Sequence, residues 1–154
     1  MAVKKKKKVV AVSGGFDPIH VGHIRMFGEA KKLGDVLVVI LNNDNWLRKK
    51  KGAVFMAEGE RKEVIEAIGC VDRVVLTRHP RNPADMTVSR DLARVKPHIF
   101  ANGGDRTAPD RREAAACARI KCAMVHNVGR GGKVQSSSWL LTNYLRRNGK
   151  IKQV

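Results

Sequence analysis

The chain has 154 residues, 43% of them hydrophobic, which is the size of one domain with a sizeable core. Its 31 Lys and Arg residues outnumber its 14 Asp and Glu residues, and the net charge of +17 predicts an anionic partner, either a phosphate compound or a nucleic acid. The longest apolar run, Val36 to Leu41, is far shorter than the roughly 20 residues that cross a membrane. The apolar stretch after the lysines at 4–8 is too short for a signal peptide. We therefore expect a single domain over residues 1–154 in the cytoplasm, with residues 1–8 as a basic N-terminal extension.

Apolar runs alternate with helical patterns from the beginning of the chain. Residues 9–12 are typical of a buried strand and are followed closely by two glycines. A stripe of apolar residues predicts a helix over 21–33, and the β-branched run at 36–41 predicts a strand that is covered on both faces. The lysine-rich residues 42–56 are expected to form a loop, which leads into a helix over about 58–68.

The same alternation continues to the end of the chain. Further strands are predicted at 73–76, 98–101 and 123–125, and further helices at about 88–95, 110–119 and 137–147. In the last helix we expect the apolar face to point inward, with Leu140, Leu141, Tyr144 and Leu145. These elements predict an α/β fold, a Rossmann-like doubly wound five-stranded parallel sheet with helices on both faces. Ligands bind such sheets at the carboxyl ends of the strands.

Ten residues at 14–23, GGFDPIHVGH, follow the first predicted strand. His20 and His23 are three residues apart at the start of a helix, so both rings are expected on one face, beside an N-terminus that favours phosphate. Two imidazoles in this position can donate hydrogen bonds to phosphate oxygens, and one such donor is worth about 3 kcal/mol in a transition state. A zinc site on the two histidines is the alternative, and Asp17 is its one obvious third ligand.

Two further segments carry groups that suit phosphate. Ser136 to Ser138 open the last predicted helix after a basic, glycine-rich loop. One serine is expected to cap that helix, and the free amides and hydroxyls around it can hold the β and γ phosphates of a triphosphate. In the lysine-rich loop, Lys51 or Lys49 is expected to reach the triphosphate as a mobile point charge, while its neighbours form a solvated surface.

The ten-residue string closely resembles the HxGH signature of the cytidylyltransferase-like nucleotidyltransferases. This family includes glycerol-3-phosphate cytidylyltransferase, heptose-1-phosphate adenylyltransferase and phosphopantetheine adenylyltransferase. The resemblance extends over nearly the whole chain, through Arg61, Cys70-Val71-Asp72, Asn102-Gly103-Gly104-Asp105 and Ser136 to Ser138. The Asn-Gly-Gly-Asp loop is closest to the heptose branch, but Arg106 stands where the family often has an aromatic residue, which leaves the acceptor open.

The resemblance implies an activity. A nucleoside monophosphate would pass from CTP or ATP to a small phosphorylated metabolite, such as glycerol phosphate or a sugar phosphate, and pyrophosphate would be released. Mg²⁺ would be the cofactor, held mainly by the triphosphate without a dedicated metal site on the protein. The family also implies a homodimer, and neither a nucleic acid nor a membrane is expected as a partner.

The resemblance also implies which residues form the site. His20 and His23 would be catalytic, together with Lys51 or Lys49. The nucleotide would be bound by Gly14, Gly15, Phe16, Asp17, Gly22, Arg61, Asn102, Gly104, Asp105, Ser136, Ser137 and Ser138. The family arginine that Arg61 resembles helps to order the lysine-rich loop or the nucleotide side of the site, and the alternative for Arg61 is a simple pairing with a glutamate at the surface. A separate candidate for the acceptor phosphate is the loop with Arg78, His79 and Arg81, for which plain surface is the alternative.

Two alternatives outside this activity fit parts of the sequence. A nucleic-acid-binding protein would explain the net charge of +17 and the lysine run, although aromatic residues make up only 5% of the chain, few for stacking on single-stranded bases. A fragment of a tRNA synthetase would share the HxGH motif, but the chain lacks the length and a Lys-Met-Ser-Lys signature. The ten-residue string favours the nucleotidyltransferase.

Overall fold

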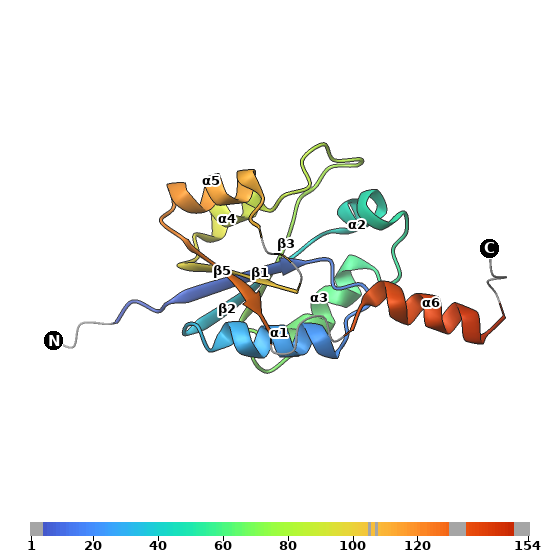
Figure 1. Cartoon of the computed structure of the whole chain (residues 1–154). Helices are drawn as coiled ribbons and strands as arrows, with labels where there is room; N and C mark the ends of the chain where they lie inside the picture. Colours follow the sequence, from blue (N-terminus) through green and yellow to red (C-terminus); the bar gives the residue numbers. More distant parts are fainter. Residues whose placement is uncertain (1–4, 105, 107, 130–134, 150–154) are drawn as a thin grey trace.

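The protein forms a five-stranded parallel sheet in the computed structural model, which describes residues 5–104, 106, 108–129 and 135–149. The strands are β1 (Val9–Gly14), β2 (Val36–Leu41), β3 (Arg73–Leu76), β4 (Ile99–Gly103) and β5 (Ala123–Val128). Their order across the sheet is β3-β2-β1-β4-β5, and every neighbouring pair is parallel. The predicted fold class is confirmed (Figure 1).

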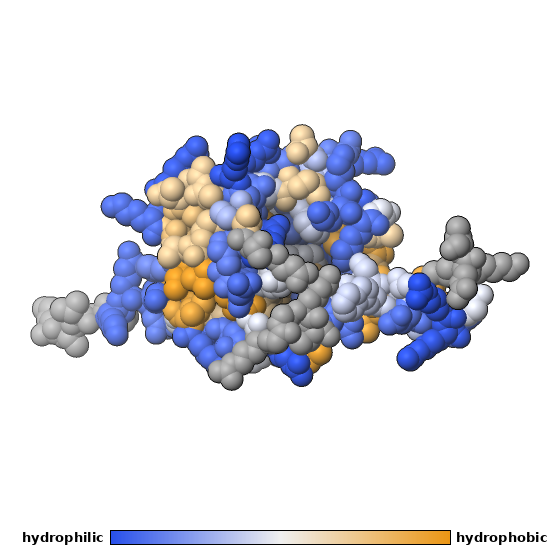
Figure 2. Space-filling model, in the orientation of Figure 1, coloured by the Kyte–Doolittle hydropathy of each residue, from blue (hydrophilic) through white to orange (hydrophobic). Residues whose placement is uncertain are grey.

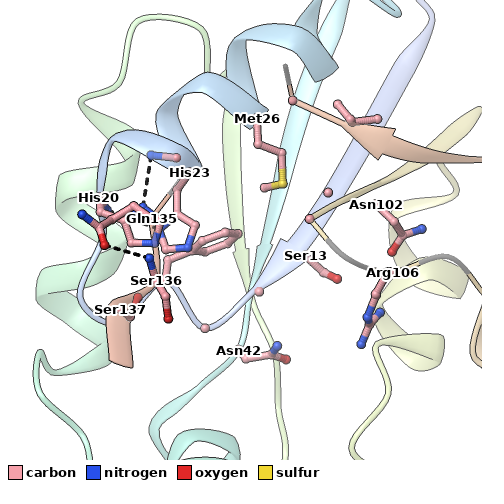
Figure 3. Close-up of a pocket in the computed structure, with 18 of the residues that line it drawn as sticks. Ser13, His20, His23, Met26, Asn42, Asn102, Arg106, Gln135, Ser136 and Ser137 are labelled. Atoms are coloured by element: carbon pink, nitrogen blue, oxygen red, sulfur yellow. Dashed lines mark hydrogen bonds between the residues drawn. The ribbon is translucent and has the colours of Figure 1, made fainter. Parts of the chain in front are cut away.

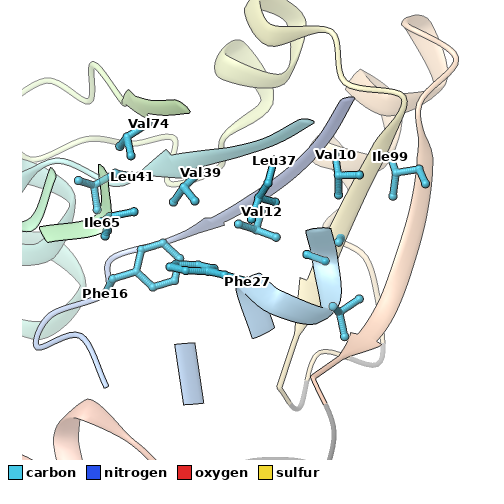
Figure 4. Close-up of a cluster of buried hydrophobic side chains, with 13 residues drawn as sticks. Val10, Val12, Phe16, Phe27, Leu37, Val39, Leu41, Ile65, Val74 and Ile99 are labelled. Carbon is cyan, nitrogen blue, oxygen red and sulfur yellow. The ribbon is translucent and has the colours of Figure 1, made fainter. Parts of the chain in front are cut away.

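The central strands are apolar because both of their faces are covered. Residues 10–12 of β1 and 37–41 of β2 are at most 2% exposed. Successive side chains of a strand point to opposite faces, so Val12 and Val39 join one core cluster while Ala11 and Ile40 join the other. Figure 4 shows the first cluster, in which the rings of Phe16 and Phe27 pack beneath the two central strands.

Four helices cover the two faces of the sheet (Figure 1). α1 (Val21–Lys31) and α3 (Glu58–Glu66) supply apolar side chains to the cluster around Val12. α4 (Ser89–Val95) and α5 (Arg111–Arg119) supply Leu92 and Cys117 to the cluster around Ile40. The sheet is therefore doubly wound, and the loops that follow its strands open at one edge, where two further helices lie.

The first of these, α2 (Asp44–Lys51), corrects a prediction, because residues 42–56 were expected to form a loop. Asn43 caps the helix by accepting a hydrogen bond from the amide of Trp46, and Gly52 ends it in a left-handed conformation with φ of 81°. Asp44 in the first turn and four basic residues in the last turn complement the helix dipole. The lysine run is thus the end of a capped helix, which fixes where each lysine points.

The last helix, α6 (Ser137–Arg147), has the predicted bounds but a different environment. It extends away from the sheet in Figure 1, and Tyr144 is 65% exposed instead of facing the core. Leu140, Leu141 and Leu145 are half-buried. The expectation that this apolar face points inward is wrong for Tyr144, because only the first turn of α6 lies against the body of the protein.

The surface carries both polar and apolar areas, with a broad apolar area on the left of the face in Figure 2. Figure 2 shows hydrophilic residues at many points around the outline, as the net charge of +17 leads one to expect. Among the helices that the structure describes, none has the length and apolar character needed to cross a membrane.

Candidate active site

A cavity of about 450 Å³ opens at the carboxyl ends of the strands. Its described lining includes Ser13 at the end of β1, Asn42 just after β2, Asn102 and Gly103 in β4, and Val128 at the end of β5. β2 and β3 lie on one side of β1, and β4 and β5 lie on the other. The cavity therefore lies at the point where the strand order reverses. This is the usual ligand site of a doubly wound sheet.

His20 and His23 line one end of the cavity, and their rings stack with centroids 3.7 Å apart. Both rings cap α1. Nδ1 of His20 accepts a hydrogen bond from the amide of Gly22 at 3.1 Å, and Nδ1 of His23 accepts one from the amide of His20 at 3.3 Å. A backbone amide can only donate, so each neutral ring must carry its proton on Nε2. The two imidazoles are therefore held as Nε2–H donors.

The protein keeps both rings neutral. Burial, the neighbouring His20 and the Lys51 ammonium lower the pKa of His23 to about 3. Burial and Lys51 also lower the pKa of His20. The donors are consequently present at neutral pH without a fixed positive charge on the rings.

Phe16 supports this pair from below. Its ring is 5% exposed and makes an edge contact with His23 at a centroid distance of 4.9 Å. A Cβ added to Gly14 would meet that ring at 2.8 Å, and one added to Gly15 would meet the side chain of Leu47 in α2 at 2.7 Å. The two glycines line the cavity as predicted, and they are required for packing as well as for access to a ligand.

Of the two candidate lysines, the structure brings Lys51 to the cavity. Its ammonium donates to the carbonyl of Asp17 at 3.1 Å, and burial lowers its pKa. Lys49 lies on another side of α2, where its ammonium donates to Asn82 at 2.7 Å in an exposed position. Of the two lysines that the sequence left open, Lys51 and not Lys49 lies at the cavity, because residues two apart on a helix cannot share a face.

Arg61 is a structural residue. It is fully buried beneath the site, not paired with a surface glutamate. Its guanidinium donates to three carbonyls, those of Met56, Gly15 and Asn42, at 2.6 to 2.8 Å, and to the carboxylate of Asp44 at 2.7 Å. Four of the five guanidinium donors are thereby used, so Arg61 joins the two ends of the lysine-rich segment to the loop after β1, which corresponds to the ordering role that the resemblance implied, and one donor is left.

Asp17 is likewise a structural residue. It is 2% exposed, and its two carboxylate oxygens accept hydrogen bonds from the amides of Phe55 and Met56, both at 2.7 Å. These bonds hold the segment between α2 and α3 against the β1–α1 loop. Asp17 is not among the described residues that line the cavity, so its contact with a nucleotide stays a prediction.

The beginning of α6 meets the histidines at the same end of the cavity. Ser136, Ser137 and Ser138 line it, and the hydroxyl of Ser137 donates to the carbonyl of Pro18 at 2.7 Å. Ser136 is the N-cap residue, yet its side chain makes no capping hydrogen bond among the described residues. Figure 3 shows Ser136 and Ser137 beside His20 and His23. Uncapped helix amides therefore face the same space as the two imidazoles.

The opposite end of the cavity is formed by residues that follow β4 and β5. Asn102, Gly103 and Gly104 line it, together with Gly129. Gly104 has φ of +67°, which favours glycine. Asn102 is 6% exposed, and its side-chain nitrogen has no hydrogen-bond partner among the described residues. Asp105, expected in the same loop, lies outside the described residues. Gly22 lines the cavity at the α1 end.

The loop proposed for the acceptor phosphate lies elsewhere. His79 is 9% exposed, and its ring nitrogens contact the hydroxyl of Thr77 and the carbonyl of Thr87 at 2.8 and 3.1 Å. Arg78 belongs to a separate groove along β3, and Arg81 is exposed. The structure does not bring these residues to the cavity, because the loop turns back over the start of α2, where Asn43 and Asn45 donate to the His79 carbonyl, and binding of the acceptor phosphate here stays a prediction.

Several lining residues were not predicted. Asn42 directly follows β2, so its place at a strand end could have identified it. Trp46 belongs to the helix that was expected to be a loop. Glu113 lies within α5 and Met86 in the long connection before α4, and nothing in their local sequence signals the cavity.

Comparisons with known proteins agree with this geometry. The cytidylyltransferase-like family model matches residues 11–139. The bifunctional protein HldE of Pelobacter propionicus is 38% identical over 103 residues, 66% of this chain, and the FAD synthase of Ferroglobus placidus is 39% identical over 100 residues, 65% of this chain. The matched region spans 20% of HldE and 60% of the FAD synthase.

Solved structures show the same fold. The lipopolysaccharide core biosynthesis protein from Thermoplasma volcanium GSS1 is similar with a TM-score of 0.66 and 29% identity, over 80% of this chain and 98% of that one. TmcAL of Thermotoga maritima, solved with alpha-thio ATP, has a TM-score of 0.68 over 93% of this chain and 51% of its own, but at 12% identity it supports the fold alone. The family model, the relatives and the cavity lead to one conclusion: the chain belongs to the cytidylyltransferase-like family of nucleotidyltransferase enzymes.

Proposed function

We propose that this protein transfers a nucleoside monophosphate from CTP or ATP to a small phosphorylated metabolite and releases pyrophosphate. One observation carries the proposal. The Nε2–H donors of His20 and His23, the ammonium of Lys51 and the uncapped N-terminus of α6 all line one cavity. Hydrogen-bond donors, a cation and free helix amides converging on one space are suited to a chain of phosphates.

The reaction would be a direct in-line displacement. A phosphate oxygen of the acceptor attacks the α-phosphorus of the triphosphate, a new P–O bond forms, and the bond to the oxygen that bridges the α and β phosphorus atoms breaks. The electron pair leaves with pyrophosphate. His20 and His23 would donate to the α and β phosphates, Lys51 would hold the chain in line, and Ser136 to Ser138 would hold the departing pyrophosphate.

Mg²⁺ fits this arrangement as a partner of the triphosphate. When bound, it would neutralise charge on the phosphate oxygens. Among the described lining residues Glu113 supplies a carboxylate, and that carboxylate is paired with Arg106. We therefore propose that the triphosphate provides most of the metal ligands.

The nucleoside would lie on the side of the cavity formed by β4 and β5. Gly103, Gly104 and Gly129 line that side without side chains, and the side chain of Met26 in α1 packs closely on Gly103. The bare backbone of these glycines allows a flat base to approach closely. Asn102 lies near the end of β4 beside these glycines, and its buried side-chain nitrogen has no hydrogen-bond partner among the described residues.

The relatives support more than one acceptor. The name of the FAD synthase gives FAD as its product, whereas the names of HldE and of the lipopolysaccharide core biosynthesis protein do not refer to FAD. The Asn102-Gly103-Gly104-Asp105 loop resembles the heptose branch of the family, so we propose a sugar phosphate or an alditol phosphate such as glycerol phosphate. We further propose a homodimer in the cytoplasm, and light scattering after size-exclusion chromatography tests the oligomeric state.

Pyrophosphate release tests the proposal. The purified chain is incubated with Mg²⁺ and either CTP or ATP, and each triphosphate is combined with glycerol 3-phosphate, sugar 1-phosphates, FMN, phosphocholine and phosphopantetheine. We expect release that needs both one triphosphate and one acceptor. A variant in which the exposed Glu63 is changed to Gln, a residue that does not line the cavity, should release pyrophosphate like the wild type and serves as the control for a change outside the site. Silence with every pair would contradict the activity.

A further inference from the structure

The cavity has a second side that the proposed triphosphate contacts leave unused. Trp46 of α2, Met86 and Val88 of the connection before α4, and Glu113 of α5 line it. Val88 packs into the core cluster beneath α4 and α5, whereas α1 lies over the other cluster. These residues therefore extend the cavity from the histidines toward the opposite face of the sheet. Figure 3 shows Ser13 and Asn42 between the histidine end and Arg106.

Asn42 presents a polar atom whose hydrogen-bonding capacity is unused. Its side chain is 3% exposed, and its Oδ1 atom has no hydrogen-bond partner among the described residues. The backbone of Asn42 is fixed, because its amide donates to the carbonyl of Gly14 and its carbonyl accepts from Arg61, while its side-chain amide lies at the cavity wall and can rotate to present Oδ1 to a ligand. Leaving a buried acceptor unpaired costs about 1–3 kcal/mol, and a ligand that donates to Oδ1 would recover that cost.

Glu113 is a buried carboxylate with capacity to spare. Its side chain is 4% exposed and accepts one bond from the amide of Val88 at 3.2 Å and one from Arg106 at 3.3 Å. A carboxylate accepts about four hydrogen bonds, and strong charge-assisted bonds are about 2.7–2.9 Å long. Both contacts are long, so Glu113 can accept further hydrogen bonds from a ligand in the cavity.

Two residues with hydrogen-bond acceptors line one cavity, and they define the chemistry of their partner. The ligand must donate, so it carries hydroxyl or ammonium groups. An ammonium is disfavoured by Arg106 at the Glu113 carboxylate and by the net charge of +17. The indole of Trp46 is fixed by a hydrogen bond to the carbonyl of Met86 at 2.9 Å, and its apolar ring forms a wall for a carbon skeleton. Hydroxyl groups on a short carbon chain or ring satisfy these conditions.

We propose that Asn42 and Glu113 select the acceptor by accepting hydrogen bonds from its hydroxyl groups, so that both are specificity-determining residues. This inference rests on the proposed function, because it assumes that the second side of the cavity takes the acceptor. Arg106 then has two roles: it holds Glu113 in place, and it keeps cationic acceptors out.

The test uses the fluorescence of Trp46. The chain has two tryptophans, so Trp139→Phe leaves Trp46 as the only one. This variant is titrated with glycerol 3-phosphate, which has two hydroxyls, and with ethyl phosphate, which has none, in the presence and absence of CTP or ATP. We expect glycerol 3-phosphate to bind at least about tenfold more tightly than ethyl phosphate, which is the value of one hydrogen bond to a charged group.

The same titration is repeated with Asn42→Ala and Glu113→Gln in the Trp139→Phe background. Each change should weaken the binding of glycerol 3-phosphate at least about tenfold and leave the affinity for ethyl phosphate unchanged. Glu63→Gln on the exposed side of α3 is the control for removing a carboxylate. Equal binding of the two phosphates, or an unchanged affinity in both variants, would overturn the inference.

A separate readout distinguishes this result from failure of the proposed function. Triphosphate affinity is measured by calorimetry in the same variants and should stay unchanged. If no triphosphate binds and no pyrophosphate is released, the proposed function fails regardless of the Trp46 signal. If triphosphate binds normally while hydroxyl groups make no difference, the acceptor inference alone fails.

Discussion

His20 and His23 do two things with the two nitrogens of each ring. Nδ1 accepts a backbone amide of the first turn of α1, and Nε2–H is left for a ligand. The same bonds that cap the helix therefore set the tautomer of both donors. This double use explains how two histidines three residues apart can have defined ring orientations on a helix that carries no acidic residue in its first turn.

This arrangement predicts the effect of removing one donor. His20→Asn keeps a side-chain oxygen that can cap α1 but removes Nε2, so we expect turnover to fall about 100-fold with little loss of stability. His20→Ala should lose turnover to the same extent and about 1 kcal/mol of stability as well, because the cap is also lost. Pyrophosphate release and urea unfolding measure the two quantities. Wild-type turnover in His20→Asn would remove the histidine from the chemistry.

The lowered pKa of His23 predicts a pH dependence of stability. The ordinary value is 6.5 and the folded value is about 3, so between these values the unfolded chain binds a proton that the folded chain does not. Stability contributed by the neutral ring is therefore lost as pH falls from about 6.5 toward about 3. We expect His23→Gln to lose less stability than the wild type between about pH 7.5 and about pH 5. Equal losses in urea midpoints would contradict the burial of a neutral ring.

At the scale of single residues, the sequence identified the right segments but not each role. Lys51 and Lys49 belong to the same basic run in the sequence. They point to different sides of α2, and only the side that carries Lys51 meets the cavity. Asp17 and Arg61 belong to the family motif, yet both are used for internal hydrogen bonds. Asn42 and Glu113 could be recognised as lining residues only once the strands and α5 were assembled.

Among the elements, α2 and its surroundings depend on one buried cation. Arg61 joins the loop after β1, the end of β2, the start of α2 and the segment before α3 through four hydrogen bonds. The apolar runs between helical patterns, together with the positions of glycines, were sufficient to predict the five strands. The helix at 44–51 was missed because four basic residues in a row suggested a solvated loop, although Asn43 and Gly52 stand at its ends as caps.

A change at Arg61 should therefore disturb the site from a distance. Arg61→Met leaves the Asp44 carboxylate and three carbonyls without their partner, and we expect a loss of about 3–5 kcal/mol of stability. Arg61→Lys retains the charge but not the fork of donors, so it should recover only part of this loss. Urea unfolding checks both. A loss below about 1 kcal/mol in Arg61→Met would contradict the structural role.

The charge of the whole molecule serves the same chemistry. A net charge of +17 attracts anions from solution and would raise the local concentration of the proposed triphosphate and phosphorylated acceptor. It also allows binding of nucleic acid without any specific site. The lysines at 5–8 are exposed, and the backbone of Lys8 is bonded to Asp35 at the start of the sheet.

Neutralising the N-terminal lysines separates the attraction of phosphate compounds from the binding of nucleic acid. Lys4 to Lys7 are changed together to Gln, which preserves the Lys8 contacts. We expect the affinity for a double-stranded DNA oligonucleotide, measured by fluorescence anisotropy at low salt, to fall and its salt dependence to weaken. Pyrophosphate release should remain within about twofold of the wild type, because Lys5 to Lys7 precede β1 and so lie at the opposite end of the sheet from the cavity. Loss of both together would favour a nucleic-acid-binding protein.

The central claim is that the histidines and the first turn of α6 form one site for a triphosphate. The most direct test compares the affinity of CTP and ATP with that of CMP and AMP by calorimetry, in the wild type, in His20→Asn and in Ser136→Ala. We predict that the better triphosphate binds the wild type at least about tenfold more tightly than its monophosphate, and that each variant loses most of this difference while monophosphate affinity is retained. Equal binding of triphosphate and monophosphate to the wild type, or an undiminished preference in both variants, would contradict it.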